Sequence, residues 1–296
     1  MKKIISIYFI LSLMGTLLST TQAKNSADTI ASPPQNIAQE RGNKKIERWQ
    51  KSAESGNAMA QYNLALCYYE GVGVTQSYEK AVEWFAKAAE QGDVDAQSYL
   101  GWCFDNGLGI AEDKEKAVEW YTKAAEQGDA SAQNNLGYCY YEGEGVPQDY
   151  KKAVEWFTKA ANQGNECAQN GLGYCYYFGK GVTQDYKEAF KWYLKSAKQG
   201  FARAQNNLGF AYEKGKGVKQ DYNKAIKWYT KAVEQGHDVA QLNLGNCYYN
   251  GIGVKQSYEK AHYWYKKSAE QGNEEAHKKL KLLCEKGLIA PEDPSK

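Results

Sequence analysis

This chain has no large excess of positive or negative charge. Its 37 basic and 35 acidic residues give a formal net charge of only +2. Proteins that bind nucleic acid or anionic membranes usually carry a strongly basic face. The composition therefore argues against a dominant role of that kind, and we expect no nucleic-acid partner. The Lys and Glu pairs along the chain are typical of a solvated helical surface.

Sequence motifs typical of catalysis, metal binding or phosphate binding are also scarce. The only three histidines are His237, His262 and His277, and none belongs to a His-Glu-x-x-His pair or a Cys/His cluster. The Gly-x-Gly segments lack a Walker lysine and a preceding strand, which makes them turns rather than phosphate-binding loops. We therefore predict no metal, no cofactor and no catalytic residue.

What the chain has in abundance is a repeat. Seven glycines are spaced 36 residues apart without a gap, and they are Gly56, Gly92, Gly128, Gly164, Gly200, Gly236 and Gly272. A fixed period of 20–50 residues indicates units that stack and bury their apolar faces against their neighbours. The period predicts an all-α solenoid whose six units span 57–92, 93–128, 129–164, 165–200, 201–236 and 237–272.

Each unit is predicted to form two helices. The second has apolar residues at helical spacing, an N-cap residue such as Ser77 or Asp113, and a C-terminal glycine such as Gly92. The first runs from about Ala58 to Glu70, and five units place a glycine in its middle. An interior glycine costs about 1 kcal/mol relative to alanine, so we expect a close helix–helix approach at this position. The tryptophans at the Trp84 position are predicted to be core.

These residues resemble a known family. The pattern Ala-Gln-x-x-Leu-Gly-x-x-Tyr-x-x-Gly-x-Gly-Val, followed by Asp-Tyr-x-x-Ala-x-x-Trp-Tyr-x-Lys-Ala-Ala-x-Gln-Gly, is similar to the Sel-1-like repeat, a relative of the tetratricopeptide repeat. The resemblance implies a right-handed superhelix of antiparallel helix pairs that serves as a protein-interaction scaffold. Residues 44–56 and 273–287 are predicted to be single capping helices, and 288–296 a tail.

The N-terminus is predicted to be a targeting segment. Lys2 and Lys3 precede a largely apolar run, and Thr21-Gln22-Ala23 offers small residues for cleavage after Ala23. This arrangement predicts a secretory signal peptide over 1–23, with an uncleaved anchor as the alternative. A flexible leader is expected over 24–43. We expect a periplasmic or secreted monomer without stable membrane insertion after cleavage.

The seven cysteines of an exported chain raise the question of disulfides. Five of them occupy one repeat position, where equivalent sites in neighbouring units should lie roughly 8–10 Å apart, too far for a disulfide. We interpret Cys67 and its equivalents as buried apolar residues. A cysteine-rich branch of the family staples each helix pair, but its layout does not match this chain. Cys167 and Cys284 are left as possible free thiols.

That branch has also been credited with β-lactamase activity, which makes one motif relevant. Ser77-Tyr-Glu-Lys80 and Ser257-Tyr-Glu-Lys260 match Ser-x-x-Lys, yet the partner motifs Lys-Thr-Gly and Ser-x-Asn are absent. Both serines stand where other units place an N-cap aspartate. We interpret them as caps, and keep a β-lactamase-like or cell-wall-active enzyme as the alternative function.

The variable repeat positions indicate where binding would occur. On a helical wheel the positions of Tyr62, Asn63, Leu66 and Tyr69 lie opposite the buried stripe of the first helix. Asparagine donates and accepts hydrogen bonds, and aromatic residues supply contact area, which suits a groove for an unknown protein or extended peptide. For the Leu66 position, packing between repeats is an equal alternative. The predicted groove residues are Asn63, Trp102, Asn134, Asn135, Tyr138, Tyr141, Asn170, Tyr174, Tyr177, Asn206, Asn207, Phe210, Asn243 and Tyr249.

Overall fold

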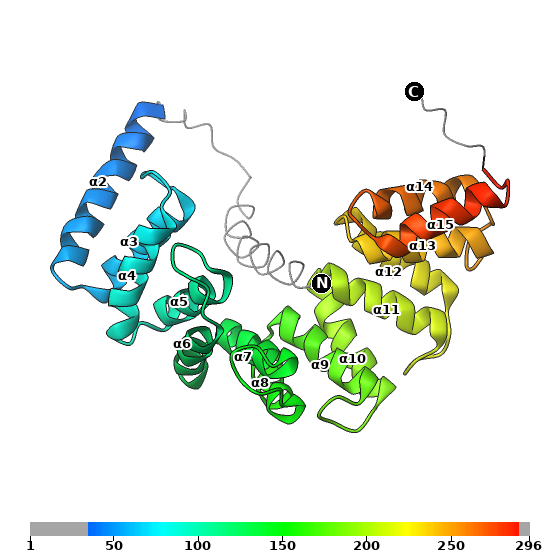
Figure 1. Cartoon of the computed structure of the whole chain (residues 1–296), viewed down its shortest axis with the longest axis horizontal. Coiled ribbons are helices and arrows are strands. Elements are labelled where there is room, and N and C mark those ends of the chain that lie inside the picture. Colours follow the sequence, from blue (N-terminus) through cyan, green and yellow to red (C-terminus); the bar gives the residue numbers. More distant parts are fainter. Residues whose placement is uncertain (1–34, 290–296) are drawn as a thin grey trace, which may run out of the picture. The chain divides into compact units, whose positions relative to one another are not determined.

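The computed structural model describes residues 35–289, and these form helices connected by short turns, without a strand in this range (Figure 1). The predicted signal peptide lies outside the described residues. The chain divides into two compact units, the first ending at Ala124 and the second beginning at Ala125. Consecutive helices pack on one another within each unit, so the structure confirms an all-α, solenoid-like arrangement of helix pairs.

The helix bounds follow the 36-residue register. The first unit holds α2 (Gln35–Glu54), α3 (Ala58–Glu70), α4 (Tyr78–Glu90), α5 (Val94–Asn106) and most of α6 (Lys114–Glu126). The second unit holds α7 (Ala130–Glu142), α8 (Tyr150–Asn162), α9 (Glu166–Phe178), α10 (Tyr186–Lys198), α11 (Ala202–Lys214), α12 (Tyr222–Glu234), α13 (Asp238–Asn250), α14 (Tyr258–Ala269) and α15 (Glu274–Glu285).

One boundary differs from the expectation. Helix α2 begins at Gln35, whereas the sequence predicted a leader up to residue 43 and a helix from Lys44. The segment between Gln35 and Lys44 has no hydrophobic periodicity, which was the signal used for the prediction. It also lacks proline, so nothing in its backbone prevents the capping helix from continuing toward the N-terminus.

The predicted helix ends are confirmed. Ser77 accepts a hydrogen bond from the backbone N–H of Lys80, and Asp149 accepts from those of Lys151 and Lys152. The first helices have caps that the sequence analysis did not name, such as Asp93, whose carboxylate accepts from the N–H of Ala96. The glycine at position 92 takes a φ of 93°, the left-handed conformation expected just beyond a helix.

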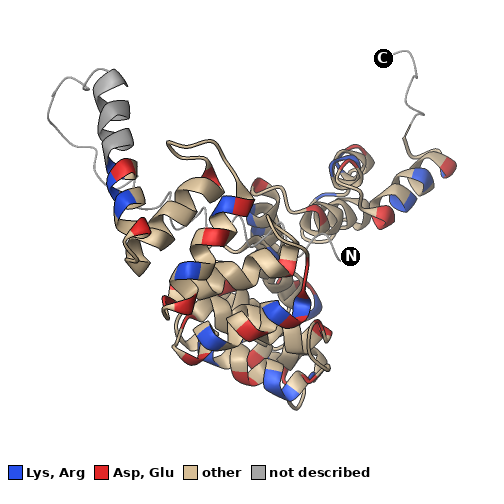
Figure 2. Ribbon diagram, turned by 60° about the vertical axis from the view of Figure 1, so that its left-hand side comes forward, with Lys and Arg blue, Asp and Glu red and all other residues tan. Residues whose placement is uncertain are grey.

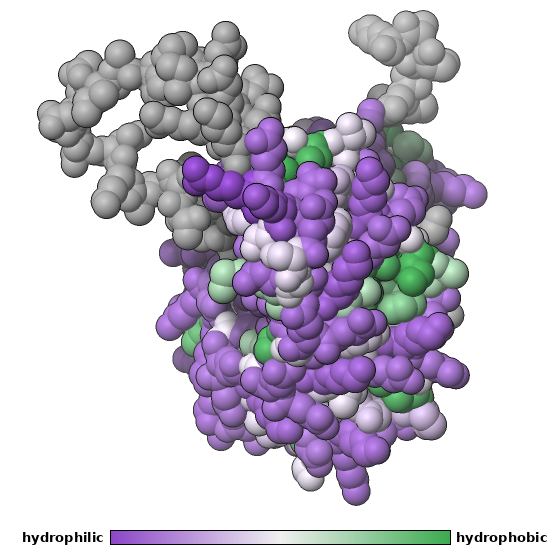
Figure 3. Space-filling view, turned by 90° about the vertical axis from the view of Figure 1, so that its left-hand side faces the viewer, coloured by the Kyte–Doolittle hydropathy of each residue, from purple (hydrophilic) through white to green (hydrophobic). Residues whose placement is uncertain are grey.

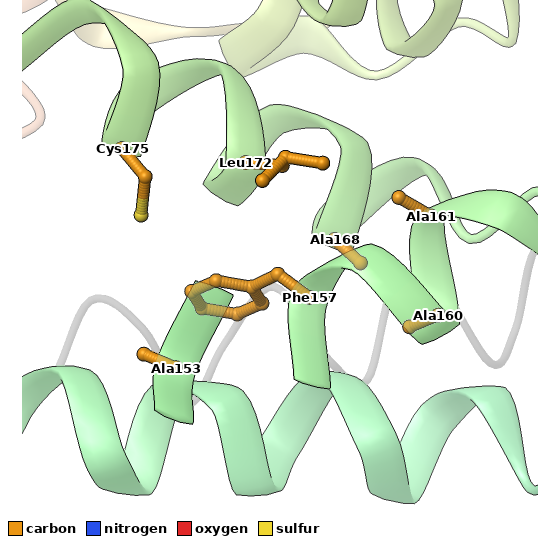
Figure 4. Close-up of a cluster of buried hydrophobic side chains, with 7 residues drawn as sticks. All are labelled: Ala153, Phe157, Ala160, Ala161, Ala168, Leu172 and Cys175. Carbon is orange, nitrogen blue, oxygen red and sulfur yellow. The ribbon is translucent and has the colours of Figure 1, made fainter. Parts of the chain in front are cut away.

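The apolar residues that were predicted to face the interior of each helix pair are buried. In the second unit, the ring of Phe157 on α8 lies against Leu172 and Cys175 of α9 (Figure 4). Each of these three side chains is at most 1% exposed. The five cysteines at the Cys67 position are buried, as predicted. Burial raises the pKa of Cys103, Cys175 and Cys247 to about 12, which makes these thiols poor nucleophiles.

The glycines inside five of the first helices mark a close contact between the two helices of the pair. A Cβ on Gly209 would lie 2.7 Å from the ring of Tyr229, and one on Gly173 would lie 2.7 Å from the ring of Tyr193. Glycine therefore lets an aromatic ring of the second helix rest directly on the backbone of the first. The same contact recurs for Gly101 with Tyr121, Gly137 with Phe157 and Gly245 with Tyr265.

The tryptophans are less buried than predicted. Trp84 and its equivalents are partly exposed, while the aromatic residue that follows each of them is buried. A lysine one turn further along covers the indole, with the Nζ of Lys159 3.8 Å from the ring centroid of Trp156. Lys87, Lys123, Lys195 and Lys231 do the same for their tryptophans. The tryptophan thus gains a cation–π contact at the surface.

We predict that Gly209→Ala destabilises the protein by about 1–2 kcal/mol. Overpacking costs roughly 1–3 kcal/mol, and the better helix propensity of alanine recovers at most about 1 kcal/mol. Urea unfolding followed by circular dichroism measures the change. The matched control is Ala65→Gly, because Ala65 holds the same repeat position without a clash; it should also destabilise, by about 1 kcal/mol, through propensity. A stabilised Gly209→Ala variant would contradict the close contact.

We predict an acid-sensitive cap at His237. This side chain is 6% exposed and its Nδ1 accepts from the backbone N–H of Ala240, at 3.2 Å. Desolvation lowers its pKa to about 4. The unfolded chain binds the proton more tightly, so this stability is present above pH 6.5 and is lost as the pH falls toward 4.

Between pH 7 and pH 5 the loss at His237 should be about 2 kcal/mol. The His237→Asn variant keeps a capping side chain but cannot titrate. The difference in unfolding free energy between wild type and variant should therefore depend on pH in this window. Parallel pH profiles for the two proteins would exclude the effect.

Candidate protein-binding surface

A ladder of hydrogen-bonded glutamines joins the helices of the framework. Gln169, near the start of α9, donates from Nε2 to the carbonyl of Ala161 at 3.1 Å. Its Oε1 accepts from Nε2 of Gln199 at 2.9 Å, and Gln199 also donates to the carbonyl of Gly164 at 2.9 Å. Repeats on either side use equivalent glutamines, with Gln163 bonded to Gln133 and Gln235 to Gln205. Gln133, Gln169 and Gln205 are buried, and because their amides are paired, they stabilise the stack.

Several predicted groove asparagines form a second ladder in the second unit. Nδ2 of Asn207 donates to Oδ1 of Asn170 at 3.0 Å, and Nδ2 of Asn243 donates to Oδ1 of Asn206 at 2.9 Å. Asn170 and Asn206 are 3% and 6% exposed. Asn170 and Asn206 therefore lie between repeats and not on an open groove, because the amides satisfy one another along the stack.

Asn134 and Asn135, in the third repeat, are also buried, at 3% and 9% exposure. Nδ2 of Asn134 donates to Oδ1 of Asn135 at 3.2 Å. Two atoms of this pair, Oδ1 of Asn134 and Nδ2 of Asn135, are buried without a hydrogen-bond partner among the described residues. Buried polar atoms without a partner are rare in folded proteins and call for an explanation.

The predicted aromatic residues divide into packing and exposed side chains. Tyr141 and Tyr177 each contact the tyrosine that begins the following second helix, with ring centroids 5.1 and 5.0 Å apart, and Tyr249 does so at 5.5 Å. Tyr138 packs on Phe157 at 4.9 Å. These four side chains therefore help to join the two helices of a repeat.

Tyr174 and Phe178 are the exposed members of the cluster. Tyr174 is 40% exposed and Phe178 is 49% exposed, and their ring centroids lie 4.4 Å apart. Tyr141 contacts Tyr174, and Tyr177 contacts Phe178. We call Tyr141, Tyr174, Tyr177 and Phe178 the aromatic shelf. Phe210 adjoins it, 6.5 Å from Tyr177.

The sequence analysis missed Phe178. The signal was present, because the same repeat position holds a charged or polar residue elsewhere, namely Glu70, Asn106, Glu142, Lys214 and Asn250. A large exposed apolar residue at such a position is informative in a way that a buried one is not.

The two candidates in the first unit are described separately. Trp102 is 5% exposed and its indole N–H donates to the hydroxyl of Tyr69 at 3.2 Å, so it packs between repeats. Asn63 is partly exposed and donates to the carbonyl of Met59 within its own helix. Trp102 therefore takes the position expected of a residue that packs between repeats. Its role in binding stays a prediction, as does that of the other candidates.

Charged side chains of both signs lie beside the shelf. Nζ of Lys214 lies 5.7 Å from the ring centroid of Phe210, and Nζ of Lys180 lies 4.8 Å from that of Tyr150, which packs on Tyr141. Burial, together with the neighbouring Glu144, raises the pKa of Glu142. Burial also raises the pKa of the hydroxyls of Tyr141 and Tyr177, so both remain neutral at physiological pH. Over the ribbon, basic and acidic residues are interspersed (Figure 2), and most of the surface seen in Figure 3 is hydrophilic, with small hydrophobic patches.

The two Ser-x-x-Lys motifs have the geometry of caps. Oγ of Ser77 accepts from the backbone N–H of Lys80 at 3.3 Å and donates to Glu79 at 2.9 Å. Nζ of Lys80 lies over the ring of Tyr68, 5.2 Å from its centroid. Ser257 and Lys260 repeat the arrangement, with Lys260 over Tyr248. Neither lysine is positioned to activate its serine.

Two further searches cover residues 35–289. No group of three or more His, Cys, Asp or Glu side chains there could hold a metal ion. Among the same residues, no helix has the length and apolar character needed to span a membrane.

The geometry defines a class of protein: a scaffold of stacked helix pairs, with a constant interior and a variable face on the first helices. The Sel1 repeat pattern matches residues 58–93, 94–129, 130–165, 168–201, 202–237 and 238–273. The chain therefore belongs to the Sel1 repeat family, and the predicted count of six units is confirmed. This fold is consistent with an adaptor for protein–protein interaction.

Two solved structures are similar over most of the chain. One is a protective antigen of uropathogenic Escherichia coli strains with an SLR fold, 41% identical, with a TM-score of 0.72 over 84% of this chain. The chain spans about half of that antigen, 53% of its length. The other is a Sel1 repeat protein from Oxalobacter formigenes, 33% identical, with a TM-score of 0.73, covering 78% of this chain and 93% of the other. No curated protein matches the chain.

We predict that Asn207→Ala destabilises the protein by about 1–3 kcal/mol, because it leaves Oδ1 of the buried Asn170 without its donor. Asn63→Ala is the matched control: its amide bonds only within its own helix, and the change should stay within about 0.5 kcal/mol. Chemical unfolding of both variants measures the difference. Equal effects would mean that the ladder contributes nothing to stability.

Proposed function

We propose that this protein is an exported, non-catalytic scaffold that binds a partner protein or an extended peptide through the first-helix face of its second unit. One observation carries the proposal. The constant repeat positions are occupied by framework contacts, whereas Tyr174 and Phe178 are large aromatic side chains left exposed on α9. Exposed aromatic residues are the side chains most often used as anchors at interfaces.

The surroundings of the shelf support a peptide or protein as the occupant. Tyrosine offers a flat apolar surface with a polar hydroxyl group, and the asparagine ladder lies on the same helices, α9 and α11. The position of Lys80 over Tyr68, and of Lys260 over Tyr248, supports a role without serine chemistry.

The proposed location rests on the N-terminal sequence. Residues 1–23 have the composition of a secretory signal, and we propose that cleavage after Ala23 releases the chain to the periplasm or the exterior. The similar Escherichia coli protein is described as a protective antigen, which fits a location accessible to a host. N-terminal sequencing of the protein from its native cells checks the cleavage site.

The binding face is tested by site-specific photocrosslinking in cells that naturally produce the protein. A benzophenone amino acid replaces Tyr174, and the matched control places it at Tyr263, which is 52% exposed on α14. We predict a discrete crosslinked adduct from position 174 and none of the same mass from position 263.

A second arm of the same experiment replaces Phe178 with Glu, the residue found at this position in two other repeats. Because the shelf then loses its exposed apolar ring, the adduct at position 174 should fall at least five-fold, while Tyr263→Ser should leave it unchanged. An adduct of equal yield from positions 174 and 263 would refute the assignment of the face.

A further inference from the structure

The charge beside the aromatic shelf changes sign from one repeat to the next. Two repeat positions carry this change, one at the end of the first helix and one in the turn that follows. From the third to the fifth repeat these positions hold Glu142 and Glu144, then Phe178 and Lys180, then Lys214 and Lys216. In the second and sixth repeats both positions are uncharged. The change of sign is therefore confined to the repeats that form the shelf or adjoin it.

Lys180 and Lys216 lie over the rings on which the shelf packs. Nζ of Lys180 is 4.8 Å from the ring centroid of Tyr150, and Nζ of Lys216 is 4.5 Å from that of Tyr186. Each of these tyrosines contacts a tyrosine of the shelf. Both lysines are half-buried, so binding an anion here orders less of the side chain than it would at a fully exposed lysine. Each ammonium group is thus held one ring away from the shelf.

The positive charge at this edge is only partly neutralised. Nζ of Lys214 lies 2.6 Å from a carboxylate oxygen of Glu213, which compensates that lysine. Lys180 and Lys216 form no ion pair with any other residue of the described range. An ammonium group has three N–H donors, and a ring face engages only one side of it. Two cations therefore keep donors for a carboxylate from outside.

We propose that Lys180, Lys214 and Lys216, called here the basic edge, bind an acidic side chain of the partner protein. A bulky apolar side chain of the same segment packs on Tyr174 and Phe178. The inference rests on the proposed function and names the kind of partner: a segment in which Asp or Glu stands close to a large apolar residue.

The third repeat determines which way such a segment lies. Glu142 and Glu144 occupy there the two positions that are basic in the fifth repeat. Like charges placed opposite one another disfavour a wrong arrangement at an interface. The acidic residue of the partner therefore lies toward the fifth repeat, with the apolar residue on the shelf.

The surface suits a protein segment better than a polyanion. Binding to nucleic acid draws on many phosphate contacts, whereas the basic edge offers three lysines, one of which is paired within the chain. A longer anion would also reach the carboxylates of Glu142 and Glu144. One acidic side chain beside one apolar side chain matches both the number of cations and the exposed pair of rings.

The test is a selection from a random-peptide library displayed on phage, with the full mature chain immobilised. We expect the enriched peptides to carry Asp or Glu within about three residues of a bulky apolar residue, since an extended segment covers roughly 10 Å in that span. The dissociation constant of a fluorescently labelled enriched peptide is then measured by anisotropy at low salt.

The decisive variant reverses the charge of the basic edge by combining Lys180→Glu with Lys216→Glu. The turn accepts glutamate, because the third repeat has Glu144 at this position. The enriched peptide should bind at least about five-fold more weakly, because two attractive pairs become repulsive. A new selection on this variant should favour Lys or Arg instead of Asp or Glu.

The matched control combines Lys159→Glu with Lys195→Glu. These lysines also lie over aromatic rings, but on the second helices α8 and α10. The change in net charge is identical, so any effect of overall charge appears in both proteins. Peptide binding by the control should match that of the wild type, and thermal melting followed by circular dichroism verifies that both variants are folded.

Several results would overturn the basic edge as a binding site. They are a selection without enrichment, enriched peptides without acidic residues, and acidic peptides that bind the reversed variant as tightly as the wild type. An oligothymidine that binds as tightly as the peptide and displaces it would show a polyanion site instead.

The basic edge and the proposed function can fail separately. A crosslinked adduct at position 174 together with peptides that lack acidic residues contradicts the acidic preference alone. Lysine-dependent binding of acidic peptides without an adduct in cells contradicts the proposed function alone.

Discussion

The contact between a glycine in the first helix of five repeats and an aromatic ring in the following second helix is the constraint on which these repeats depend. The ring of Tyr193 lies where any side chain on Gly173 would collide with it. This close approach fixes the spacing of the two helices, and Leu172 and Cys175 lie in one apolar layer. Since five successive repeats make the same contact, the spacing of the helix pair is the same in each of them.

Polar side chains inside the stack are paired by hydrogen bonds and so stabilise the interior. The glutamines bond to each other within a repeat and to backbone carbonyls of the repeat before, and the asparagines of the fifth and sixth repeats bond back to the repeat before. A buried amide that finds both partners stabilises a unique arrangement, whereas one that finds none is costly. Most of the asparagines are paired in this way. Asn134 and Asn135 are the exception, since each has one buried polar atom without a hydrogen-bond partner among the described residues.

This changes the interpretation of the variable face. A row of asparagines in a sequence resembles an open hydrogen-bonding surface, but most of these side chains are engaged with one another. The surface that remains is aromatic and local, formed by Tyr174 and Phe178 with Tyr141 and Tyr177 beside them. A scaffold of similar repeats thus has an exposed aromatic pair, Tyr174 and Phe178, on a single helix.

The amino-acid sequence by itself determined the helix pairs, their caps and the buried stripe, because these follow from periodicity and from local backbone chemistry. Ala58 to Glu70 and the Ser77 cap were predicted to the residue. It could not determine which polar side chains would pair, because Asn170 and Asn207 are 37 residues apart and meet only when repeats stack. Nor could it show that Trp84 would lie partly exposed, since burial depends on how neighbouring helices pack. Only the tertiary structure decided which side chains of a repeat position pair or pack between helices, such as Asn170, and which stay exposed, such as Tyr174 and Phe178, because burial depends on the neighbouring repeat.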